Sequence, residues 1–411
     1  MSRDFTHHPQ PLNLALWHRL PAGLMVVGGL LALIGAVKAP AEFGSSWLLA
    51  FLFFYSIALG ALFLVLVHHL TDAGWSVGIR RSCEHLASLL RLPLILMFLP
   101  IALFAPKIYP WMTIDPATNN LIAAKLPVFT RTGFYVGSAI FFGVWWLLTS
   151  RLDSLSLKQD RTGAAECTRK MRFHSGWGII AFALTLTASS GLWLEALQYQ
   201  WFSAMFGVYF FSDCAWAGLA TVYVLAAILL RQRILTAVLP AKCFYFMGLL
   251  LFAFTLFSAY TEFTQYFVVW NANLPAETGG YLLRENGNWW WLGLFLIAGH
   301  FLIPFFLLLP MTVKTNFKIV IPLCLWIGLM HAADLGFNIF PALHNGGNPL
   351  KWLWLPLGCL MFMGGFLATV FLKKLNSHPP FPQHDPRLLE AMGVNPDIVN
   401  DLAGTATGGG R

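Results

Sequence analysis

Two histidines lie near the middle of long apolar segments of this chain, where ionisable side chains are costly. His300 and His331 fall at similar depths in their segments, and Asp334 follows His331 by about one helical turn. A charged residue near the centre of a membrane helix costs about 2.5–3.5 kcal/mol on insertion scales, so such residues usually pair or serve a function. The pattern predicts a shared polar interior that relays protons. The alternatives are hydrogen-bonded core histidines or, much less favoured, a pair of haem ligands.

Two carboxylates also lie inside apolar segments, toward the predicted outer ends of the helices. At the depth of Asp213 and Glu262, a carboxylate must find a partner or stay protonated. Gln265 lies about one turn beyond Glu262 on the same segment. Glu195 lies nearer the end of its segment, where an interfacial role is the simpler interpretation. Asp213 and Glu262 are therefore candidates for proton transfer.

A third group of polar residues follows the second apolar segment at its predicted inner end. His68 and Asp72 are four positions apart, so they share a helical face if the helix continues, and Arg80 and Glu84 have the same spacing. With His69, these residues could form the cytoplasmic mouth of a proton path. The alternative is a solvated interfacial segment with local salt bridges.

Ordered by depth, the candidates form a column with three parts: His68 and Asp72, then His300 and His331, then Asp334, Glu262 and Asp213. Proton conduction needs titratable groups within reach of each other or of bound waters. The hypothesis requires the helices that carry these residues to lie side by side, with the polar side chains facing the protein interior.

The elements that would position these residues are membrane helices. The chain has 411 residues, 57% of them hydrophobic and 11% charged, whereas a soluble domain carries about 25% charged residues. About 20 apolar residues cross the hydrocarbon, and ten runs qualify: 20–37, 47–70, 86–105, 131–150, 176–197, 206–230, 243–270, 289–310, 318–341 and 352–372. We expect the first run to remain as a helix rather than be removed as a signal peptide. Pro106 and Pro110 are expected to end the third run, Pro310 the eighth and Pro341 the ninth. The fold class is an all-α integral membrane protein.

The distribution of Lys and Arg predicts the orientation of the helices. Twenty of the 26 cationic residues lie in one alternating set of connections, which comprises the N-terminus, 71–91, 151–172, 231–242, 314–318 and the C-terminal tail. By the positive-inside rule, both termini are cytoplasmic. We expect a cytoplasmic segment 1–19, a transmembrane domain 20–372, an extended cytoplasmic tail 373–411, and a place in the bacterial inner membrane.

No cofactor, metal ligand set or catalytic residue is predicted for this chain itself. Six cysteines occur, but none forms a CxxC or CxxCH motif, which disfavours c-type haem, a zinc site or an iron–sulfur cluster on this chain. Most of the cysteines lie in or beside apolar runs, where a thiol acts as a small hydrophobe.

One stretch resembles a known family. Residues 260–278 read YTEFTQYFVVWNANLPAET and are similar to the S-Q-Y-x-x-x-W-Y-A-N-x-P-E-E-T motif of the NrfD/polysulfide-reductase-type membrane subunits of alternative complex III. The chain has Thr264 for the Ser, Asn271 for the Tyr and Ala276 for the first Glu. Three more stretches, 200–211, 74–84 and 384–393, also resemble this family, and the second of its two membrane subunits (ActF) is the better match.

The resemblance implies a fold and a role. The family's membrane subunits form two four-helix bundles with flanking helices, inside a complex that oxidises quinol and reduces cytochrome c or a haem–copper oxidase. It implies haem c and iron–sulfur clusters on partner subunits, and it leaves open a quinol site near this chain. The implied partners are an iron–sulfur/molybdopterin-like subunit, multihaem cytochrome c subunits and a sister NrfD-like subunit, with a haem–copper oxidase as an optional further partner. In the family, the second membrane subunit is thought to provide structure and a proton path.

Two other functions stay open at this point. A quinol-binding anchor of a related molybdenum or iron–sulfur oxidoreductase would use an apolar pocket beside Glu262 or Asp213. A free-standing secondary transporter is less favoured, because the chain shows neither clear repeats nor helices broken near the midplane.

Overall fold

The computed structural model describes residues 15–126, 128–236, 238–285, 287–344 and 353–393. Every regular element in these ranges is helical. Ten helical spans are long and apolar enough to cross a membrane: Arg19–Lys38, Pro40–Thr71, Gly74–Ile108, Arg131–Thr162, Ala165–Gln198, Phe206–Arg231, Ala241–Ala272, Asn288–Leu308, Phe317–Leu343 and Trp354–Ser377. The architecture is that of a multi-pass membrane protein, and each of the ten predicted runs is confirmed.

Individual helices subdivide some of these spans. The long ones are α1 (Ala15–Lys38), α2 (Pro40–Thr71), α3 (Val77–Ala87), α4 (Leu92–Ile108), α6 (Arg131–Thr162), α7 (Ala165–Trp193), α8 (Phe206–Arg231), α9 (Ala241–Ala272), α11 (Asn288–Leu296), α13 (Phe317–His344) and α14 (Trp354–Ser377). The short ones are α5 (Asn120–Ala124), α10 (Pro275–Leu282), α12 (Ile303–Leu308) and α15 (Leu388–Ala391), with 3₁₀ turns at Gly74–Ser76, Ser88–Leu90, Pro110–Thr113, Pro116–Thr118, Glu195–Gln198 and Met311–Thr315. Between α11 and α12, the residues Ile297–Leu302 form a π-helical turn, η6.

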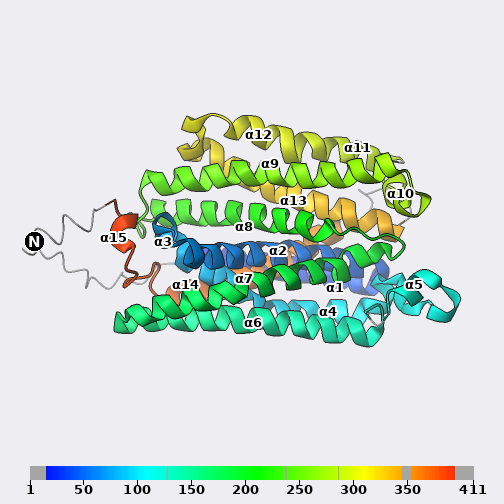
Figure 1. Ribbon diagram of the computed structural model, residues 1–411, viewed down its shortest axis with the longest axis horizontal. Helices are drawn as coiled ribbons and strands as arrows, with labels where there is room; N and C mark the ends of the chain where they lie inside the picture. The colour runs from blue at the N-terminus through cyan, green and yellow to red at the C-terminus, as the bar shows by residue number, and fades with distance from the viewer. Residues whose placement is uncertain (1–14, 127, 237, 286, 345–352, 394–411) are drawn as a thin grey trace, which may run out of the picture.

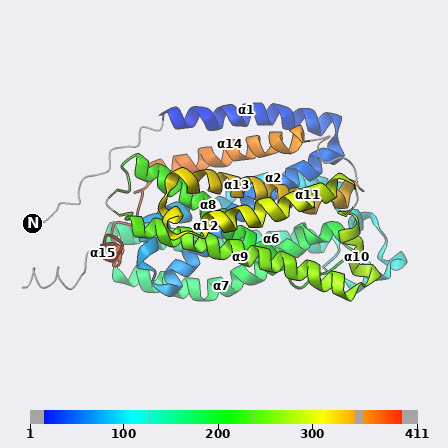
Figure 2. The same ribbon diagram turned by 90° about the horizontal axis from the view of Figure 1, so that it is seen from above.

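The long helices run roughly parallel to one another along the molecule (Figure 1). Helix α2 is central and packs against α4, α7, α8, α13 and α14. Helices α6 and α7 pack together beside α2 and α4, whereas α9 packs against α8 and α12, and α13 packs against α8 and α11. Helices α1 and α14 lie side by side at one edge (Figure 2). We call the two ends of the molecule the α15 end and the α10 end.

Helices α2 and α8 approach closely because both carry a glycine at the crossing. A Cβ atom built on Gly60 would lie 1.9 Å from the backbone oxygen of Cys214, and one on Gly218 would lie 2.8 Å from the Cα of Gly60. Only a residue without a side chain fits there. This contact fixes α8, with its polar residues, against the central helix.

Two predicted loops are instead helical. The segments 71–91 and 151–172 were expected to be connections, but α3 begins at Val77, α6 continues to Thr162 and α7 begins at Ala165. Buried ion pairs hold them: Arg81 contacts both Glu84 and Asp160. Because these charges satisfy one another inside the protein, helix can continue through polar sequence.

Two proline boundaries also differ from expectation. Pro341 was expected to end its helix, but it lies inside α13, which continues to His344. Pro106 lies within the last turn of α4, which ends at Ile108.

The tail is not extended over its described part. Helix α14 continues to Ser377, and the residues up to 393 return across the α15 end of the bundle. The backbone N–H of Gln383 donates to Asp160 (3.0 Å), and Arg387 pairs with Asp72 (2.7 Å). The prediction of an extended tail from 373 is therefore wrong for residues 373–393, while 394–411 lie outside the described residues.

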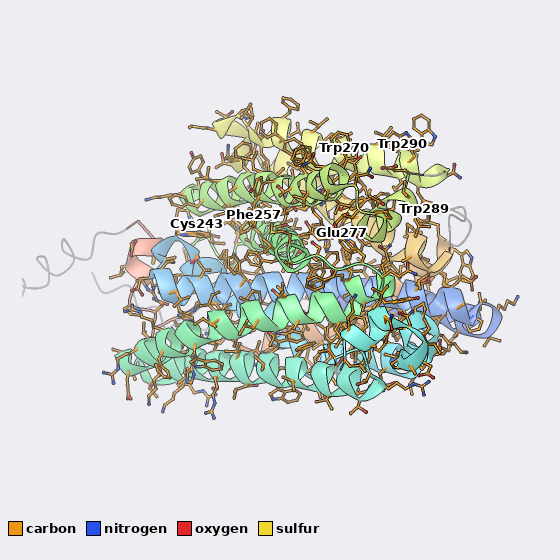
Figure 3. All side chains as sticks on the ribbon, turned by 45° about the vertical axis from the view of Figure 1, so that its right-hand side comes forward. Cys243, Phe257, Trp270, Glu277, Trp289 and Trp290 are labelled. Carbon is orange, nitrogen blue, oxygen red and sulfur yellow. The ribbon has the colours of Figure 1, made fainter. Side chains whose placement is uncertain are left out.

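The motif at the end of α9 has a local physical reason. Asn273 caps the helix with a left-handed backbone (φ 48°), and Pro275 occupies the first turn of α10, which are favoured positions for Asn and Pro. Figure 3 shows Trp270, Trp289 and Trp290 near this end and Cys243 near the other end of α9.

Candidate functional site

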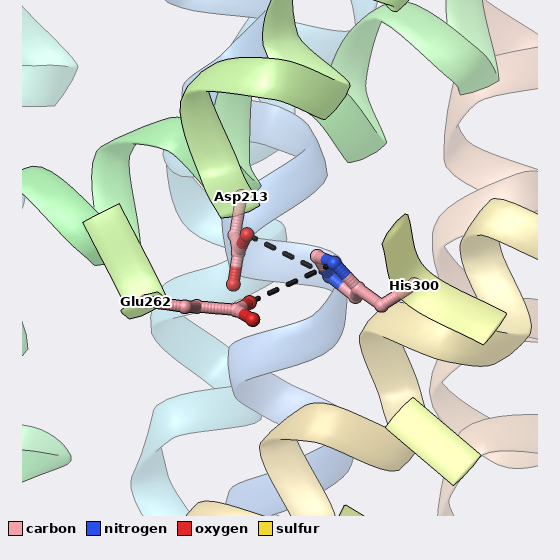
Figure 4. Close-up of side chains that lie close together, drawn as sticks. All are labelled: Asp213, Glu262 and His300. Carbon is pink, nitrogen blue, oxygen red and sulfur yellow. Dashed lines mark ion pairs between the residues drawn. The ribbon is translucent and has the colours of Figure 1, made fainter. Parts of the chain in front are cut away.

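Three ionisable side chains from different helical segments converge inside the half of the molecule formed by α8, α9 and α11–α13. They are Asp213 of α8, Glu262 of α9 and His300 of η6 (Figure 4). The His300 Nε2 atom lies 3.8 Å from Asp213 Oδ1, and its Nδ1 atom lies 3.6 Å from Glu262 Oε1. Asp213 and His300 are buried, whereas the Glu262 side chain is 35% exposed at the surface of the bundle.

The π-helical turn η6 explains how His300 reaches this position. Pro304 has no N–H, so it cannot donate to the carbonyl of His300 four residues earlier. The N–H of Ile303 donates instead to the carbonyl of Ala298, five residues back. The carbonyl of Gly299 is thereby freed and accepts a bond from the Trp326 indole (2.8 Å). Single π-helical turns of this kind occur often at functional sites.

Hydroxyl groups surround the Asp213 carboxylate. Ser258 on α9 donates a hydrogen bond to it, and the Ser212 hydroxyl lies 3.2 Å from that of Ser258 and 3.3 Å from that of Thr261. The Trp216 ring packs against the His300 imidazole, with 4.3 Å between ring centroids. The row of hydroxyls offers donors and acceptors that can reorient beside the carboxylate.

A second polar group adjoins the first, one turn away on α8. The Tyr209 hydroxyl donates to the Asp334 carboxylate of α13. The Asn338 amide donates to the Tyr209 oxygen (2.8 Å) and to the backbone oxygen of Asp334 (3.0 Å). The Arg284 guanidinium closes this side through bonds to the backbone oxygens of Phe337 and Asn338 (2.9 and 3.2 Å).

His331 links α13 to the central helix. Its Nε2 atom lies 2.7 Å from the Ser56 hydroxyl on α2. Its Nδ1 atom has no hydrogen-bond partner among the described residues, although the side chain is fully buried. The prediction that the helices carrying His300, His331 and the carboxylates lie side by side is therefore confirmed, and the middle and outer parts of the column form one group. We call Asp213, Glu262, His300, His331 and Asp334, together with Tyr209, the central cluster.

The charge balance of the central cluster is unusual. Among the described residues, no Lys or Arg forms an ion pair with Asp213, Glu262 or Asp334. Buried carboxylates without a cationic partner must be neutralised by protons or by bound cations. The cluster therefore has the capacity to take up positive charge.

The predicted inner residues form a separate cluster at the α15 end, and here the charges are paired. Arg80 contacts Glu84 (3.2 Å) and Asp385 of the C-terminal segment. His68 lies 2.7 Å from the Ser76 hydroxyl and 3.8 Å from Asp385. Its neighbour His69 is also buried, with both ring nitrogens unpartnered among the described residues. Burial raises the pKa of the Asp385 carboxyl, but the bond with His68 and the charges of Arg80 and Arg387 lower it more, so the net pKa lies below its ordinary value.

The condition for one predicted relationship in this cluster, that the helix continues beyond His68 to Asp72, is not met. Helix α2 ends at Thr71, and Asp72 adopts a left-handed backbone (φ 52°), so Asp72 does not share a helical face with His68. Its half-exposed side chain pairs instead with Arg172 and Arg387. The predicted contact between Arg80 and Glu84 is confirmed, and the local salt bridges fit the structural alternative left open by the sequence.

A gap separates the two clusters. Ser56 and His68 are twelve positions apart on α2, which corresponds to about 18 Å of helix. The buried residues between them on α2 include Leu59, Leu62 and Leu66. A cavity of ≈ 10 Å³ lies beside this stretch and is lined by Leu62, Val65, Glu84, Ala87, Thr149, Leu152 and Asp153. One water needs roughly 10–15 Å³, so this space has room for about one water beside Glu84, and its lining from α2, α3 and α6 includes no residue of the central cluster.

Several site residues were not predicted from the sequence. Tyr209 and Ser56 lie in aromatic and apolar runs where they look like ordinary core residues, and Asp385 lies in the predicted free tail. Tyr209 could have been identified from its spacing of four positions to Asp213, which places both residues on one helical face.

No protein-family model and no curated protein sequence matches this chain. The resemblance at 260–278 therefore stays a prediction that depends on the motifs themselves.

Proposed function

We propose that this chain is a cofactor-free membrane subunit of a quinol:cytochrome c oxidoreductase of the alternative complex III type, and that it relays protons through its interior. The observation that carries the proposal is the central cluster. It gathers buried carboxylates and histidines at the depth of the membrane helices without any Lys or Arg ion pair among the described residues. Such groups at membrane depth are typical of proton relays.

The central cluster supplies a sequence of proton-transfer steps. Glu262, at the bundle surface, and Asp213, in the interior, face opposite ring nitrogens of His300. A proton taken at one nitrogen can be matched by release from the other, because imidazole binds and releases protons through both. The steps of 3.6 and 3.8 Å need only a small side-chain movement or one water.

The α15-end cluster would serve as the inner entrance of this path. The small cavity beside Glu84 has room for about one water between α2, α3 and α6, and the apolar stretch between it and the central cluster would have to be crossed by transient waters. Quinol oxidation would take place in or beside a sister NrfD-like subunit. Its redox change would alter local charge or packing and so drive protons through this chain.

The proposed setting is the bacterial inner membrane, with the α15 end in the cytoplasm. The grouping of α2, α4, α6 and α7, and of α8, α9 and α11–α13, with α1 and α14 at the edge, supports the two-bundle fold of the family. The partners proposed are an iron–sulfur/molybdopterin-like subunit and multihaem cytochrome c subunits at the α10 end, with a haem–copper oxidase as an optional further partner.

Orientation can be tested with single cysteines. All six native cysteines are buried, so Arg161→Cys at the α15 end and Gly279→Cys at the α10 end would be the exposed thiols. A membrane-impermeant thiol reagent added to intact spheroplasts should label the Gly279 variant and not the Arg161 variant. The reverse labelling would refute the proposed orientation.

A proton-translocation assay tests the relay. The tagged chain is purified in mild detergent, the haem spectrum confirms the partners, and the complex is reconstituted into vesicles with a pH dye inside. Glu262→Gln, Asp213→Asn and His300→Gln should each reduce translocation at least tenfold while haem content stays constant. Glu166→Gln, in an exposed ion pair on α7, is the control. Normal translocation in all three variants would refute the relay, and a colourless lone protein would refute the complex and favour a transporter.

A quinol-binding anchor remains the second candidate, because one observation favours it. Glu262 is 35% exposed, and the exposed ring of Phe263 lies next to it in sequence on α9, so a quinol from the membrane could reach the carboxylate. A photoreactive quinone analogue should then label α9, with labelling lost in Glu262→Gln. Labelling confined to a partner subunit would exclude this candidate.

A further inference from the structure

The group formed by Asp213, Glu262 and His300 also has the composition of a metal site. One ligand atom from each side chain lies within 4.8 Å of the others. Two ligands of a tetrahedral ion at about 2.0–2.1 Å are themselves about 3.3 Å apart. The His300 Nε2 atom lies 3.8 Å from Asp213 Oδ1, which is close to that separation, whereas the 3.6 Å contact of Glu262 is with the other ring nitrogen, Nδ1. One ion binds a single imidazole nitrogen, so Glu262 must rotate from the Nδ1 side toward Nε2 to join Asp213 on the same ion, a movement within the 4.8 Å that separates the ligand atoms.

A second, independent feature points to a ligand. The Nε2 atom of His300 has no hydrogen-bond partner among the described residues, although the residue is only 2% exposed. This nitrogen faces the Asp213 carboxylate across the space between the three side chains (Figure 4). An unpartnered buried nitrogen is costly, and a metal ion would satisfy it.

We propose that Asp213, Glu262 and His300 bind one divalent transition-metal ion of the Zn²⁺ class. The charges of the ion and of the two carboxylates cancel. Without the ion, protons bound to the carboxylates would have to neutralise them. Metal binding is independent of the proposed proton relay. If both hold, the bound ion displaces the transferable protons and blocks translocation.

The donor set selects the class of ion. Mg²⁺ and Ca²⁺ require about six to eight oxygen ligands in an open shell of carboxylates, carbonyls and waters, whereas this site offers an imidazole and two carboxylates. One imidazole with two carboxylates suits Zn²⁺, Co²⁺ or Mn²⁺, with binding strongest toward the end of the Irving–Williams order. Three protein ligands leave one position for a water or for a nearby hydroxyl, as in open zinc sites. The 35% exposure of Glu262 provides the entry.

Cobalt binding provides a direct test that does not depend on turnover. The full chain is purified within its native complex, stripped of metal with a chelator and titrated with Co²⁺. The absorption spectrum of a variant without the proposed ligands is then subtracted from that of the wild type. Tetrahedral Co²⁺ with N/O ligands should give visible d–d bands that saturate at one ion per chain and that disappear on addition of Zn²⁺. An excess of Mg²⁺ should leave the bands unchanged.

Matched variants assign the site. His300→Gln and Asp213→Asn should weaken Co²⁺ binding at least a hundredfold. Glu262→Gln, at the partly exposed edge where folding is least at risk, should weaken it at least tenfold. His174→Gln on α7, which removes a half-buried histidine outside the site, is the control and should bind normally. Absence of the bands in the wild type, or their persistence in both His300→Gln and Glu262→Gln, would overturn the proposal. Metal binding with normal translocation would overturn the relay alone.

Discussion

The Tyr209 hydroxyl donates a hydrogen bond to the Asp334 carboxylate, and this bond joins α8 to α13 across 125 positions of sequence. Asn338 donates to the same phenolic oxygen at 2.8 Å. Tyr209 and Asn338 hold the Asp334 carboxylate in place inside the bundle, where no Lys or Arg among the described residues forms an ion pair with it. The bond therefore fixes both the packing of the two helices and the position of one proposed proton carrier.

Replacing Tyr209 with Phe should destabilise the protein by about 0.5–1.5 kcal/mol, the usual net contribution of a hydrogen bond. Chemical unfolding in detergent, followed by tryptophan fluorescence, measures this loss. Asp334→Asn alone and the double variant complete a thermodynamic cycle. A coupling energy near zero between the two positions would contradict the contact.

The ten membrane spans could be predicted because run length and apolar composition determine them. The exact ends of these spans could not be predicted from run length and composition. The polar stretches 77–90 and 151–162 are helical because Arg81 pairs with both Glu84 and Asp160 inside the protein. A hydropathy average over a short window counts such residues as water-facing, because it contains no information about ion pairs between distant segments.

The candidate site could be predicted only by depth. The positions of Asp213, Glu262 and His300 within their runs placed them at membrane depth, but their contact depends on the π-helical turn before Pro304, which changes the direction of the His300 side chain. The two clusters were predicted at different depths, but the length of the gap between them depends on Ser56, the α2 residue that contacts His331, and this contact was not predicted. Asp385 was unpredictable because its partner Arg80 lies 305 positions away.

Asp385→Asn should release the C-terminal segment from the α15 end. Removing one partner of a buried ion pair costs about 3–5 kcal/mol, and the Asp385 side chain is fully buried against Arg80. Hydrogen–deuterium exchange over residues 378–393 should accelerate strongly. Glu166→Gln removes an exposed pair with Lys170 and should leave this exchange unchanged. Equal protection in the wild type and Asp385→Asn would show that other contacts hold the segment.

The docking of this segment should resist moderate acid. The pKa of Asp385 is lower in the folded protein than in an unfolded chain, so its contribution is complete above the unfolded value of about 3.9 and is lost as the pH falls through the lower folded value. Exchange protection of 378–393, corrected for intrinsic rates, should therefore stay constant from about pH 8 to pH 5 and fall only below about pH 4. A loss between pH 7 and pH 5 would implicate a histidine such as His68 instead.

The close approach of α2 and α8 makes Gly60 intolerant of even one methyl group. The added Cβ would lie 1.9 Å from the Cys214 backbone oxygen, and backbone cannot move aside as a flexible side chain can. Gly60→Ala should therefore destabilise the protein by about 1–3 kcal/mol or more and displace Asp213, the residue directly before Cys214, from His300.

Gly143→Ala in α6 and Gly328→Ala in α13 are matched controls, because nothing lies within 4 Å of their added Cβ atoms. They should be neutral or stabilising by up to about 1 kcal/mol. Thermal unfolding gives the stability, and Co²⁺ binding reports the site. Wild-type stability in Gly60→Ala would mean that the two helices are further apart than described.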